Sequence, residues 1–229
     1  AWHILKGAER LAAENYDIMK GAFLGPAFHN DEILKTLRKY QAEYQYYQDF
    51  DSLIKTTAEY IAGGKVAGWF QGRMEYGPRA LGNRSILGDA RNPEMQKKMN
   101  LKIKFREGFR PFAPAVTEEA IAEYFELDRP SPYMLLVVPV NSSRCIPQPE
   151  DYDDFGLYEK LYRVRSDIPA VTHVDFSARL QSVSRETNPR FWQLISEFKR
   201  QTGCSVLINT SFNVRGEPIV CSPDEAYRC

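Results

Sequence analysis

One eighteen-residue stretch, GRMEYGPRALGNRSILGD at residues 72–89, contains three arginines and four glycines. Glycine and proline at this density disfavour a regular helix, so we expect an irregular loop. In such a loop, glycine lets the backbone approach an anion, and arginine offers a planar fork that matches phosphate or carboxylate. Arg79 is fixed between Pro78 and Ala80, and we expect its guanidinium to bind an anion.

The other two arginines of this stretch have a simpler interpretation. Arg73 and Arg84 have acidic residues nearby in the sequence, namely Glu75 and Asp89. We therefore expect Arg73 and Arg84 to form structural ion pairs with these carboxylates rather than to bind a ligand.

A second basic segment, KIKFREGFRPFAPAV at residues 102–116, follows an expected helix. Cations at the C-terminal end of a helix interact favourably with its dipole, which alone would explain Lys102 and Lys104. The dipole does not explain Arg110, which lies in an aromatic, proline-stiffened run. A guanidinium held among apolar groups needs a partner, and a ligand phosphate is one candidate.

Two later segments also bring polar groups together. HVDFSARLQSV at residues 173–183 contains His173 and Arg179, whose simpler interpretation is a satisfied core histidine and a surface arginine. In INTSFNVRGEP at residues 208–218, a buried strand is expected to end in a turn whose amides and hydroxyls can cradle phosphate or sugar oxygens. Ordinary turn chemistry would account for the same residues. The candidates in this turn are Asn209, Ser211 and Asn213.

Helical and strand patterns alternate along the chain and must position these segments. Capping residues followed by apolar residues at helical spacing predict helices at residues 30–44, 51–64, 92–105, 117–125 and 188–203. Short β-rich runs predict strands at residues 65–70, 133–140, the first half of 170–183, and two strands within 204–220. This alternation favours an α/β domain with a twisted, mixed β-sheet flanked by helices.

The composition excludes some classes of protein. The 229 residues include 30 Lys and Arg and 30 Asp and Glu, so the chain is not a polycation suited to nucleic acid or an anionic membrane. The charges are nevertheless uneven, because residues 72–110 contain ten Lys or Arg against four Asp or Glu. No apolar run is long enough to cross a membrane.

Several signatures of other sites are missing from the sequence. It contains no GxxxxGK[ST] phosphate loop, no GxGxxG fingerprint and no GxSxG elbow. The four cysteines form no CxxC pair and no zinc-ligand spacing is present, so we predict no metal site in this chain. Unpaired cysteines favour a reducing, cytoplasmic location.

Both ends of the chain have the features of a fragment. Residues 1–20 are expected to be a linker or the tail of a missing N-terminal domain, followed by one domain at residues 21–229. Ser222, Pro223 and Glu225 predict the start of a helix, yet the chain ends soon afterwards. The C-terminal end of the domain is therefore expected to be truncated.

Four motifs together resemble the C-terminal domain of the NodU/CmcH-type O-carbamoyltransferases: GWFQGRMEYGPRALGNRSILGD, KIKFREGFRPFAPAV, THVDFSARLQSV and LINTSFNVRGEPIV. Their order and approximate spacing agree with the family. The resemblance implies a YrdC-like α/β fold. It also implies that carbamoyl phosphate and ATP give carbamoyl-adenylate and pyrophosphate, after which the carbamoyl group moves to a substrate hydroxyl.

The resemblance also divides the chemistry between two domains. In the family, a preceding domain carries a metal site and catalyses transfer to a hydroxylated small molecule. This chain would then form or bind the adenylate without completing the transfer. Mg²⁺ is expected with ATP, and candidates for its ligands are Glu75, Asp89 and Asp175.

The expected site residues carry over by motif. Arg79, Lys104 and Arg110 match positions that surround carbamoyl phosphate and the nucleotide phosphates, so catalytic roles are implied for them. Fixed cations would offset the repulsion between several anions without reorganising during the reaction. Arg179 and Ser211 match further pocket positions. The predicted site residues are Arg79, Lys104, Arg110, Arg179, Asn209, Ser211 and Asn213.

An alternative is an RNA- or nucleotide-binding YrdC-like module without carbamoyl transfer, because YrdC-like folds also occur in tRNA-modification proteins. The basic stretch at residues 72–110 would then be an electrostatic footprint. However, the net charge is zero, and the basic residues lie among glycine, proline and phenylalanine rather than along a helix face. We therefore do not expect nucleic acid as a partner.

Overall fold

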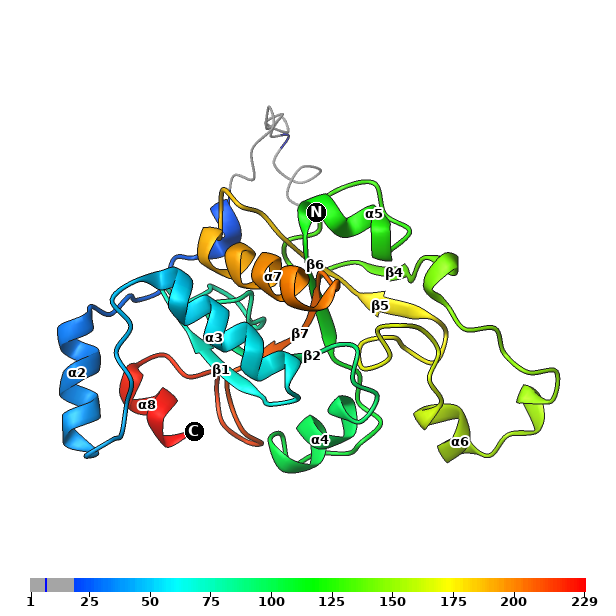
Figure 1. Ribbon diagram of the computed structural model, residues 1–229, viewed down its shortest axis with the longest axis horizontal. Helices are drawn as coiled ribbons and strands as arrows, with labels where there is room; N and C mark the ends of the chain where they lie inside the picture. Colours follow the sequence, from blue (N-terminus) through cyan, green and yellow to red (C-terminus); the bar gives the residue numbers. More distant parts are fainter. Residues whose placement is uncertain (1–6, 8–18) are drawn as a thin grey trace.

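A five-stranded sheet forms the centre of the structure, a computed structural model (Figure 1). In order across the sheet, the strands are β1 (Ala67–Phe70), β2 (Arg84–Asp89), β7 (Val206–Ser211), β3 (Ala113–Thr117) and β6 (Gln181–Val183). β3 and β6 run parallel, whereas the other neighbours are antiparallel. The predicted α/β fold with a mixed sheet flanked by helices is confirmed.

The structure describes residue 7 and residues 19–229. The predicted linker or tail at residues 1–20 lies almost entirely outside the described residues. The described residues contain the sheet and its helices, and the domain bounds at residues 21–229 stay a prediction.

Helices α3 (Phe50–Ala62) and α7 (Pro189–Thr202) pack against each other and cover one face of the sheet (Figure 1). α7 buries four apolar side chains at helical spacing, and it begins at the predicted cap Asn188. α3 is capped by Asp49 rather than by the predicted Asp51. These two helices supply much of the apolar core against the sheet.

Helix α4 (Met95–Lys102) approaches β2 at Gly88. A Cβ atom at position 88 would lie 2.9 Å from the sulfur of Met99, so glycine is what allows this close approach. Met95 and Met99 are fully buried, as the predicted apolar stripe requires. The helix therefore delivers the basic segment that follows it to the end of the sheet.

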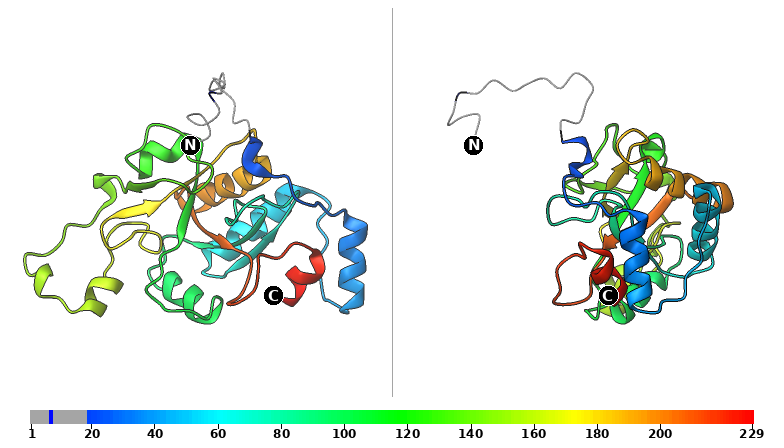
Figure 2. Two further views of the ribbon diagram at one scale, coloured as in Figure 1. Left: turned by 180° about the vertical axis from the view of Figure 1, so that it is seen from behind. Right: turned by 90° about the vertical axis from the view of Figure 1, so that its left-hand side faces the viewer.

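Two further helices pack together beside the sheet (Figure 2). They are α2 (Asn30–Lys39) and α8 (Pro223–Arg228). Asp224 accepts hydrogen bonds from the side chains of Lys39, at 2.5 Å, and Tyr40, at 3.0 Å. The short helix α5 (Ile121–Tyr124) lies near β4 instead.

Two strand predictions are wrong, and a third is confirmed only in part. In the segment 133–140, predicted as a central strand, only β4 (Val137–Pro139) forms, and it pairs with β5 (Ser177–Arg179) in a separate two-stranded sheet. The first half of 170–183 forms turns, and the second strand predicted within 204–220 does not form. A strand needs a pairing partner as well as suitable residues, and the local sequence does not specify that partner.

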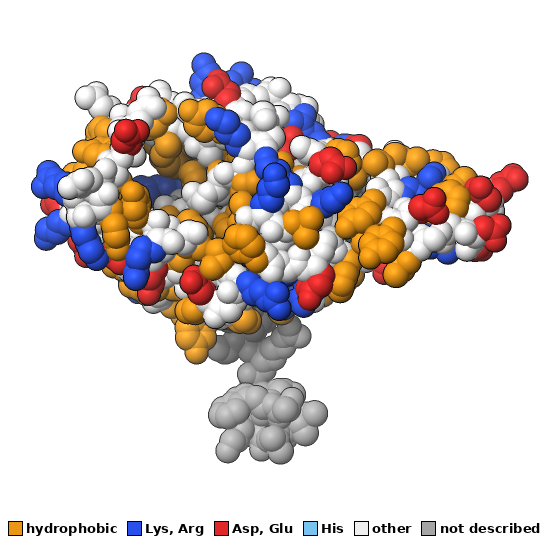
Figure 3. All heavy atoms as spheres, turned by 90° about the horizontal axis from the view of Figure 1, so that it is seen from below, with side chains coloured by type: hydrophobic (Ala, Val, Ile, Leu, Met, Phe, Trp, Pro, Cys, Tyr) orange, Lys and Arg blue, Asp and Glu red, His pale blue; other side chains and the backbone are white. Residues whose placement is uncertain are grey.

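The segment at residues 141–168 projects from the body of the structure (Figure 2). It contains the 3-10 turns η3 (Ser142–Arg144) and η4 (Tyr152–Asp154) and the helix α6 (Leu157–Tyr162). Acidic side chains gather at its tip (Figure 3), around η4. Among the described residues, no helix has both the length and the apolar character needed to cross a bilayer.

Candidate functional site

Glu75 organises the loop between β1 and β2. One of its carboxylate oxygens accepts hydrogen bonds from the backbone N–H groups of three later loop residues, at 2.7 to 3.1 Å. The loop folds around this buried carboxylate and leaves Arg79 exposed. The loop predicted at residues 72–89 is shorter than expected, because its last six residues form the buried strand β2.

Arg84 is fully buried at the start of β2. Its guanidinium donates to backbone carbonyls from three parts of the chain, with 2.8 Å to Gln71 O, 3.2 Å to Pro26 O and 3.3 Å to Cys221 O. It also stacks on the ring of Phe70, 3.6 Å from the ring centroid. Burial lowers the pKa of Arg84 from its usual value.

The ion pairs predicted for Arg73 and Arg84 with Glu75 and Asp89 are wrong. Asp89 pairs instead with Arg91, at 2.7 Å, and Arg73 donates to a backbone carbonyl at 2.8 Å. Backbone carbonyl oxygens, rather than the predicted carboxylates, therefore accept the hydrogen bonds of Arg73 and Arg84. Arg73 and Arg84 hold the loop in place, as expected of structural residues.

Gly82 is where this loop packs against α7. Its φ is +106°, and a Cβ atom there would lie 2.2 Å from Cδ1 of Phe191. We expect Gly82→Ala to lower the free energy of unfolding by about 1–3 kcal/mol, because it adds steric overlap to a strained backbone. Gly77→Ala is the matched control, since its φ is +119° and no atom lies within 4 Å of the added Cβ. Equal urea midpoints for the two variants would contradict the packing argument.

Asn209 lies in β7, almost fully buried. Its Nδ2 donates to the carbonyl of Ala80 at 3.1 Å and to Oε1 of Gln181 at 2.6 Å. Ala80 directly follows Arg79, and Gln181 lies two residues after Arg179. Asn209 thus links the segments that carry Arg79 and Arg179 to the central strand β7. It lines neither of the two cavities described below.

Four cations line a cavity of about 210 Å³ beyond the end of β7. They are Lys104, Arg106, Arg110 and Arg215. The Lys104 ammonium donates hydrogen bonds to the side-chain Oδ1 of Asn213 at 2.8 Å and to the backbone carbonyl of Asn213 at 2.9 Å. It also donates to the carbonyl of Ser211 and contacts its Oγ at 3.3 Å. The turn after β7 is therefore fastened to the basic segment after α4.

The charges in this basic cavity are poorly balanced. Burial, followed by the like charge of Arg106, lowers the pKa of Lys104 to about 8. Burial and the charge of Arg110 likewise lower the pKa of Arg106. Glu107 is the one acidic side chain among the described lining residues, and it pairs with Arg110 at 2.9 Å. Such a cavity attracts anions.

Arg79 and Arg179 form a second basic group outside this cavity. Burial, and then the like charge of Arg79, lower the pKa of Arg179, so the two guanidinium groups lie within electrostatic range of each other. Among the described residues, neither forms an ion pair with a carboxylate. Two neighbouring cations without a carboxylate partner are a second place where an anion could bind.

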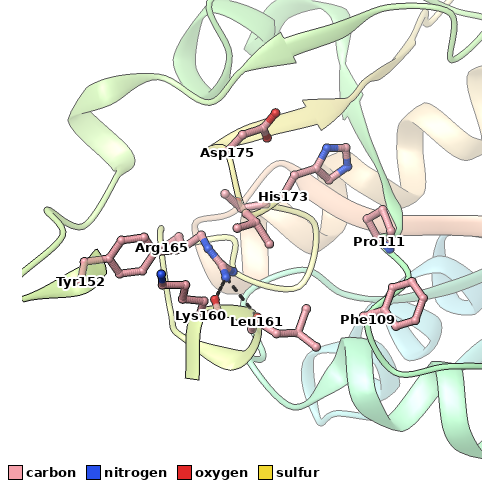
Figure 4. Close-up of a pocket in the computed structure, with 10 residues that line it drawn as sticks. Phe109, Pro111, Tyr152, Lys160, Leu161, Arg165, His173 and Asp175 are labelled. Carbon is pink, nitrogen blue, oxygen red and sulfur yellow. Dashed lines mark hydrogen bonds between the residues drawn. The ribbon is translucent and has the colours of Figure 1, made fainter. Parts of the chain in front are cut away.

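A larger cavity of about 620 Å³ lies on the other side of the loop that carries Arg110 (Figure 4). Phe109 and Pro111 form one wall, and the projecting segment forms the opposite wall through side chains that include Tyr152 and Leu161. His173 also lines it. Because most of its walls are apolar, this cavity differs in character from the basic one.

A carbamoyltransferase C-terminus family model matches residues 58–229, which is most of the chain and includes both cavities. The chain belongs to this family. It is 57% identical over 231 residues to an uncharacterised protein of Synechocystis sp., covering all of this chain and 37% of that protein. It is 40% identical over 207 residues to the nodulation protein NolO of Bradyrhizobium diazoefficiens, covering 89% of this chain and 34% of that protein.

A relative of stated activity is also similar to this carbamoyltransferase C-terminal domain. A 3'-hydroxymethylcephem-O-carbamoyltransferase of Amycolatopsis lactamdurans is 39% identical over 160 residues, covering 70% of this chain and 26% of that enzyme. The chain spans about a third of the length of the first two relatives, with 37% and 34% covered. The predicted resemblance to the NodU/CmcH-type carbamoyltransferases is confirmed.

The structure divides the predicted site residues of this carbamoyltransferase domain into three groups. Lys104, Arg110, Ser211 and Asn213 line the basic cavity together, although the two segments are about a hundred residues apart in sequence. Arg79 and Arg179 form the second group. Asn209 lies between, within the sheet. Four of the seven predicted site residues therefore line one cavity, and the other three do not.

Two cations of the basic cavity, Arg106 and Arg215, were not among the predicted site residues. The sequence did offer a signal for each. Arg106 lies two residues after Lys104, and Arg215 lies two residues after Asn213, within segments already chosen for their chemistry. The guanidinium of Arg215 donates a hydrogen bond to the carbonyl of Phe105 at 3.4 Å. The basic segment and the turn after β7 are therefore joined twice.

Each carboxylate suggested as a Mg²⁺ ligand already has a hydrogen-bond or ion-pair partner, although the second oxygen of Glu75 is buried without a partner among the described residues. Glu75 accepts three backbone hydrogen bonds through one oxygen, and Asp89 pairs with Arg91. Asp175 accepts from the hydroxyl of Ser177 at 2.6 Å. Among the described residues, no three His, Cys, Asp or Glu side chains cluster as metal ligands do. These residues do not fit a Mg²⁺ ion held by the protein itself.

Proposed function

We propose that this carbamoyltransferase domain binds ATP and carbamoyl phosphate and forms carbamoyl-adenylate. Water cleaves carbamoyl phosphate to carbamate and inorganic phosphate. A carbamate oxygen then attacks the α-phosphorus of ATP, and the bond to the β-phosphate breaks to release pyrophosphate. The carbamoyl group would pass to the hydroxyl of a small-molecule acceptor in a part of the protein outside this chain.

The basic cavity is the observation that carries this proposal. The reaction brings a triphosphate and a second phosphate together, and their mutual repulsion must be offset. Lys104, Arg106, Arg110 and Arg215 provide four positive charges in about 210 Å³, a volume suited to phosphate groups rather than to a whole nucleotide. Hydrogen bonds from Lys104 to the Ser211–Asn213 turn fix one of these charges before a ligand arrives.

The second basic group supports the same proposal. Arg79 and Arg179 offer another anion-binding position, so the phosphate of carbamoyl phosphate and the phosphates of ATP need not share one place. Mg²⁺ would enter as the complex with ATP, held by nucleotide oxygens and water. The proposed location is the cytoplasm, where ATP is available.

Arg110 offers the first test. Arg110→Ala is expected to weaken binding of ATP, measured by isothermal titration calorimetry, about tenfold, since a hydrogen bond to a charged group contributes about 1.5–3 kcal/mol and Arg110 is half exposed. Exchange of labelled pyrophosphate into ATP, dependent on carbamoyl phosphate, should fall in parallel. Arg129→Ala is the matched control, because Arg129 is exposed and pairs with Asp128 away from the cavity.

Two results would contradict the proposed function. One is wild-type chain that is folded by circular dichroism yet shows no heat of binding for ATP or carbamoyl phosphate with Mg²⁺. The other is affinity for RNA that falls steeply with salt while ATP does not compete, which would favour the nucleic-acid alternative. Equal effects of Arg110→Ala and Arg129→Ala would remove Arg110 from the site.

A further inference from the structure

A chain of hydrogen bonds fixes the imidazole of His173 at the wall of the apolar cavity. The hydroxyl of Ser177 donates to Oδ1 of Asp175 at 2.6 Å. The same hydroxyl oxygen lies 3.0 Å from Nδ1 of His173. Because the single hydroxyl proton is directed to the carboxylate, the Ser177 oxygen can only accept from His173. The neutral imidazole therefore carries its proton on Nδ1, and Nε2 keeps a free lone pair.

Most of the other polar side chains of this cavity already form hydrogen bonds, although the buried Nε of Arg165 has no partner among the described residues. Thr172 donates to the carbonyl of Ile168 at 3.0 Å, and Lys160 donates to the carbonyl of Asp153 at 2.8 Å. Arg165 donates to backbone carbonyls of the projecting segment, as the dashed lines in Figure 4 show in part. Among the described residues, no hydrogen bond to Nε2 of His173 is formed. Among the described residues, two acceptors of this mostly apolar cavity therefore have no hydrogen-bond donor: Nε2 of His173, and Oδ2 of Asp175, whose Oδ1 accepts from Ser177.

We propose that this cavity binds the adenine ring of ATP, and that Nε2 of His173 accepts a hydrogen bond from the exocyclic amino group of the base. The inference rests on the proposed function and adds to it the position of the base and the reason for choosing adenine. An apolar, partly aromatic cavity of about 620 Å³ suits a planar heterocycle. Phe109 and Tyr152 offer aromatic rings against which a base can stack.

The two cavities share a wall that is one loop thick. Phe109 and Pro111 line the apolar cavity, whereas Arg110 between them lines the basic cavity. One nucleotide can therefore place its base on one side of this loop and its phosphates on the other. Gly108 admits Tyr162 of α6 beside the loop, where an added Cβ would lie 2.7 Å from the tyrosine hydroxyl. The projecting segment therefore lies close against the loop at this point.

The polarity of His173 gives the proposal a sharp consequence. Adenine carries a donor at the position where hypoxanthine carries a carbonyl acceptor, so unprotonated Nε2 should prefer ATP to ITP. Protonated His173 carries a hydrogen on Nε2 and should favour the carbonyl of ITP instead. Burial lowers the pKa of His173, and Arg179 adds to this effect, whereas Asp175 opposes it. The other charged groups at the cavity are Lys160 and Arg165.

Calorimetric titration of the chain with ATP, ITP and inorganic tripolyphosphate tests this proposal. At pH 7.5, ATP should bind about tenfold more tightly than ITP. The ratio should approach one in His173→Ala and should fall towards pH 5.5 in the wild type, while tripolyphosphate binding stays unchanged in the variant. ATP and ITP share the same phosphates, so titration of the phosphates cancels in the ratio. His29→Ala, at an exposed histidine, is the control variant.

Ser177→Ala tests the hydrogen-bond chain separately. Without the serine hydroxyl, the tautomer of His173 is no longer fixed, so the ATP-to-ITP ratio should decrease at pH 7.5 while circular dichroism is unchanged. A wild-type ratio near one, or a ratio that His173→Ala leaves unchanged, would overturn this inference and leave the proposed function standing. If neither ATP nor tripolyphosphate binds to the wild type, the proposed function fails as well.

Discussion

Arg84→Met is expected to lower the free energy of unfolding by about 3–5 kcal/mol, comparable to breaking a buried ion pair. The substitution keeps an apolar stem of similar length and removes every donor of the guanidinium. Carbonyl groups of Gln71, Pro26 and Cys221 would then be left without this partner, and each unpaired buried group costs about 1–3 kcal/mol. Among the described residues Arg84 forms no ion pair, although the nearby charge of Glu75 favours its protonated form, so removing the buried charge returns only part of that loss.

The test compares urea denaturation midpoints and slopes for three variants. Arg84→Lys should be nearly as unstable as Arg84→Met, since one ammonium cannot reach carbonyls that approach the planar fork from several directions. Arg129→Met, at an exposed residue, should stay within about 0.5 kcal/mol of the wild type. If Arg84→Met also stayed within that range, the guanidinium would not hold the loop in place.

Arg84 shows why the site was harder to predict than the helices. The caps and apolar periodicity of α7 are local, so Asn188 and the helix that follows it could be read from the sequence. The partners of Arg84 are backbone carbonyls, which every residue possesses, and they come from segments more than a hundred residues apart. A sequence names candidate carboxylates near an arginine, but it does not reveal which carbonyls will surround it.

The same distinction separates β7 from the misplaced strand at residues 133–140. Both are short apolar runs, yet β7 pairs on both sides within the main sheet, whereas β4 pairs only with β5. Pairing is a property of the whole fold, and strand propensity varies with such context. The apolar cavity was missed for a related reason, because the polar segment at residues 141–168 gave no sign that it would fold back against the loop around Arg110.

The basic cavity was more predictable because its chemistry is concentrated in two short segments. Lys104 and Arg110 came from one, and Ser211 and Asn213 came from the other. The structure adds that Lys104 is buried and fastened to the second segment by hydrogen bonds. A buried cation that already has a fixed position loses little conformational entropy when a phosphate binds. This makes Lys104 the residue of the cavity whose removal should matter most.

Lys104→Met is expected to slow the carbamoyl-phosphate-dependent exchange of pyrophosphate into ATP by about a hundredfold or more. Removal of one preorganised charge-stabilising contact typically costs about 2.7–4 kcal/mol in the transition state. The variant would also release the Ser211–Asn213 turn, so circular dichroism and a urea midpoint must accompany the rate. Lys102→Met is the matched control, because this neighbouring lysine is exposed and lines no described cavity.

The dependence of the rate on pH distinguishes an electrostatic role of the Lys104 charge from a structural role of its side chain in holding the Ser211–Asn213 turn. With a pKa of about 8, Lys104 is roughly nine-tenths protonated at pH 7 and one-tenth protonated at pH 9. Only the protonated form attracts phosphate, so kcat/KM should fall as the pH rises through about 8, the value that belongs to the free protein. Bound phosphate would raise the pKa, and the fall in kcat should therefore occur at higher pH. If Lys104→Met kept the same step in kcat/KM near pH 8, the titrating group would be another residue and the proposed role of the Lys104 charge would be wrong.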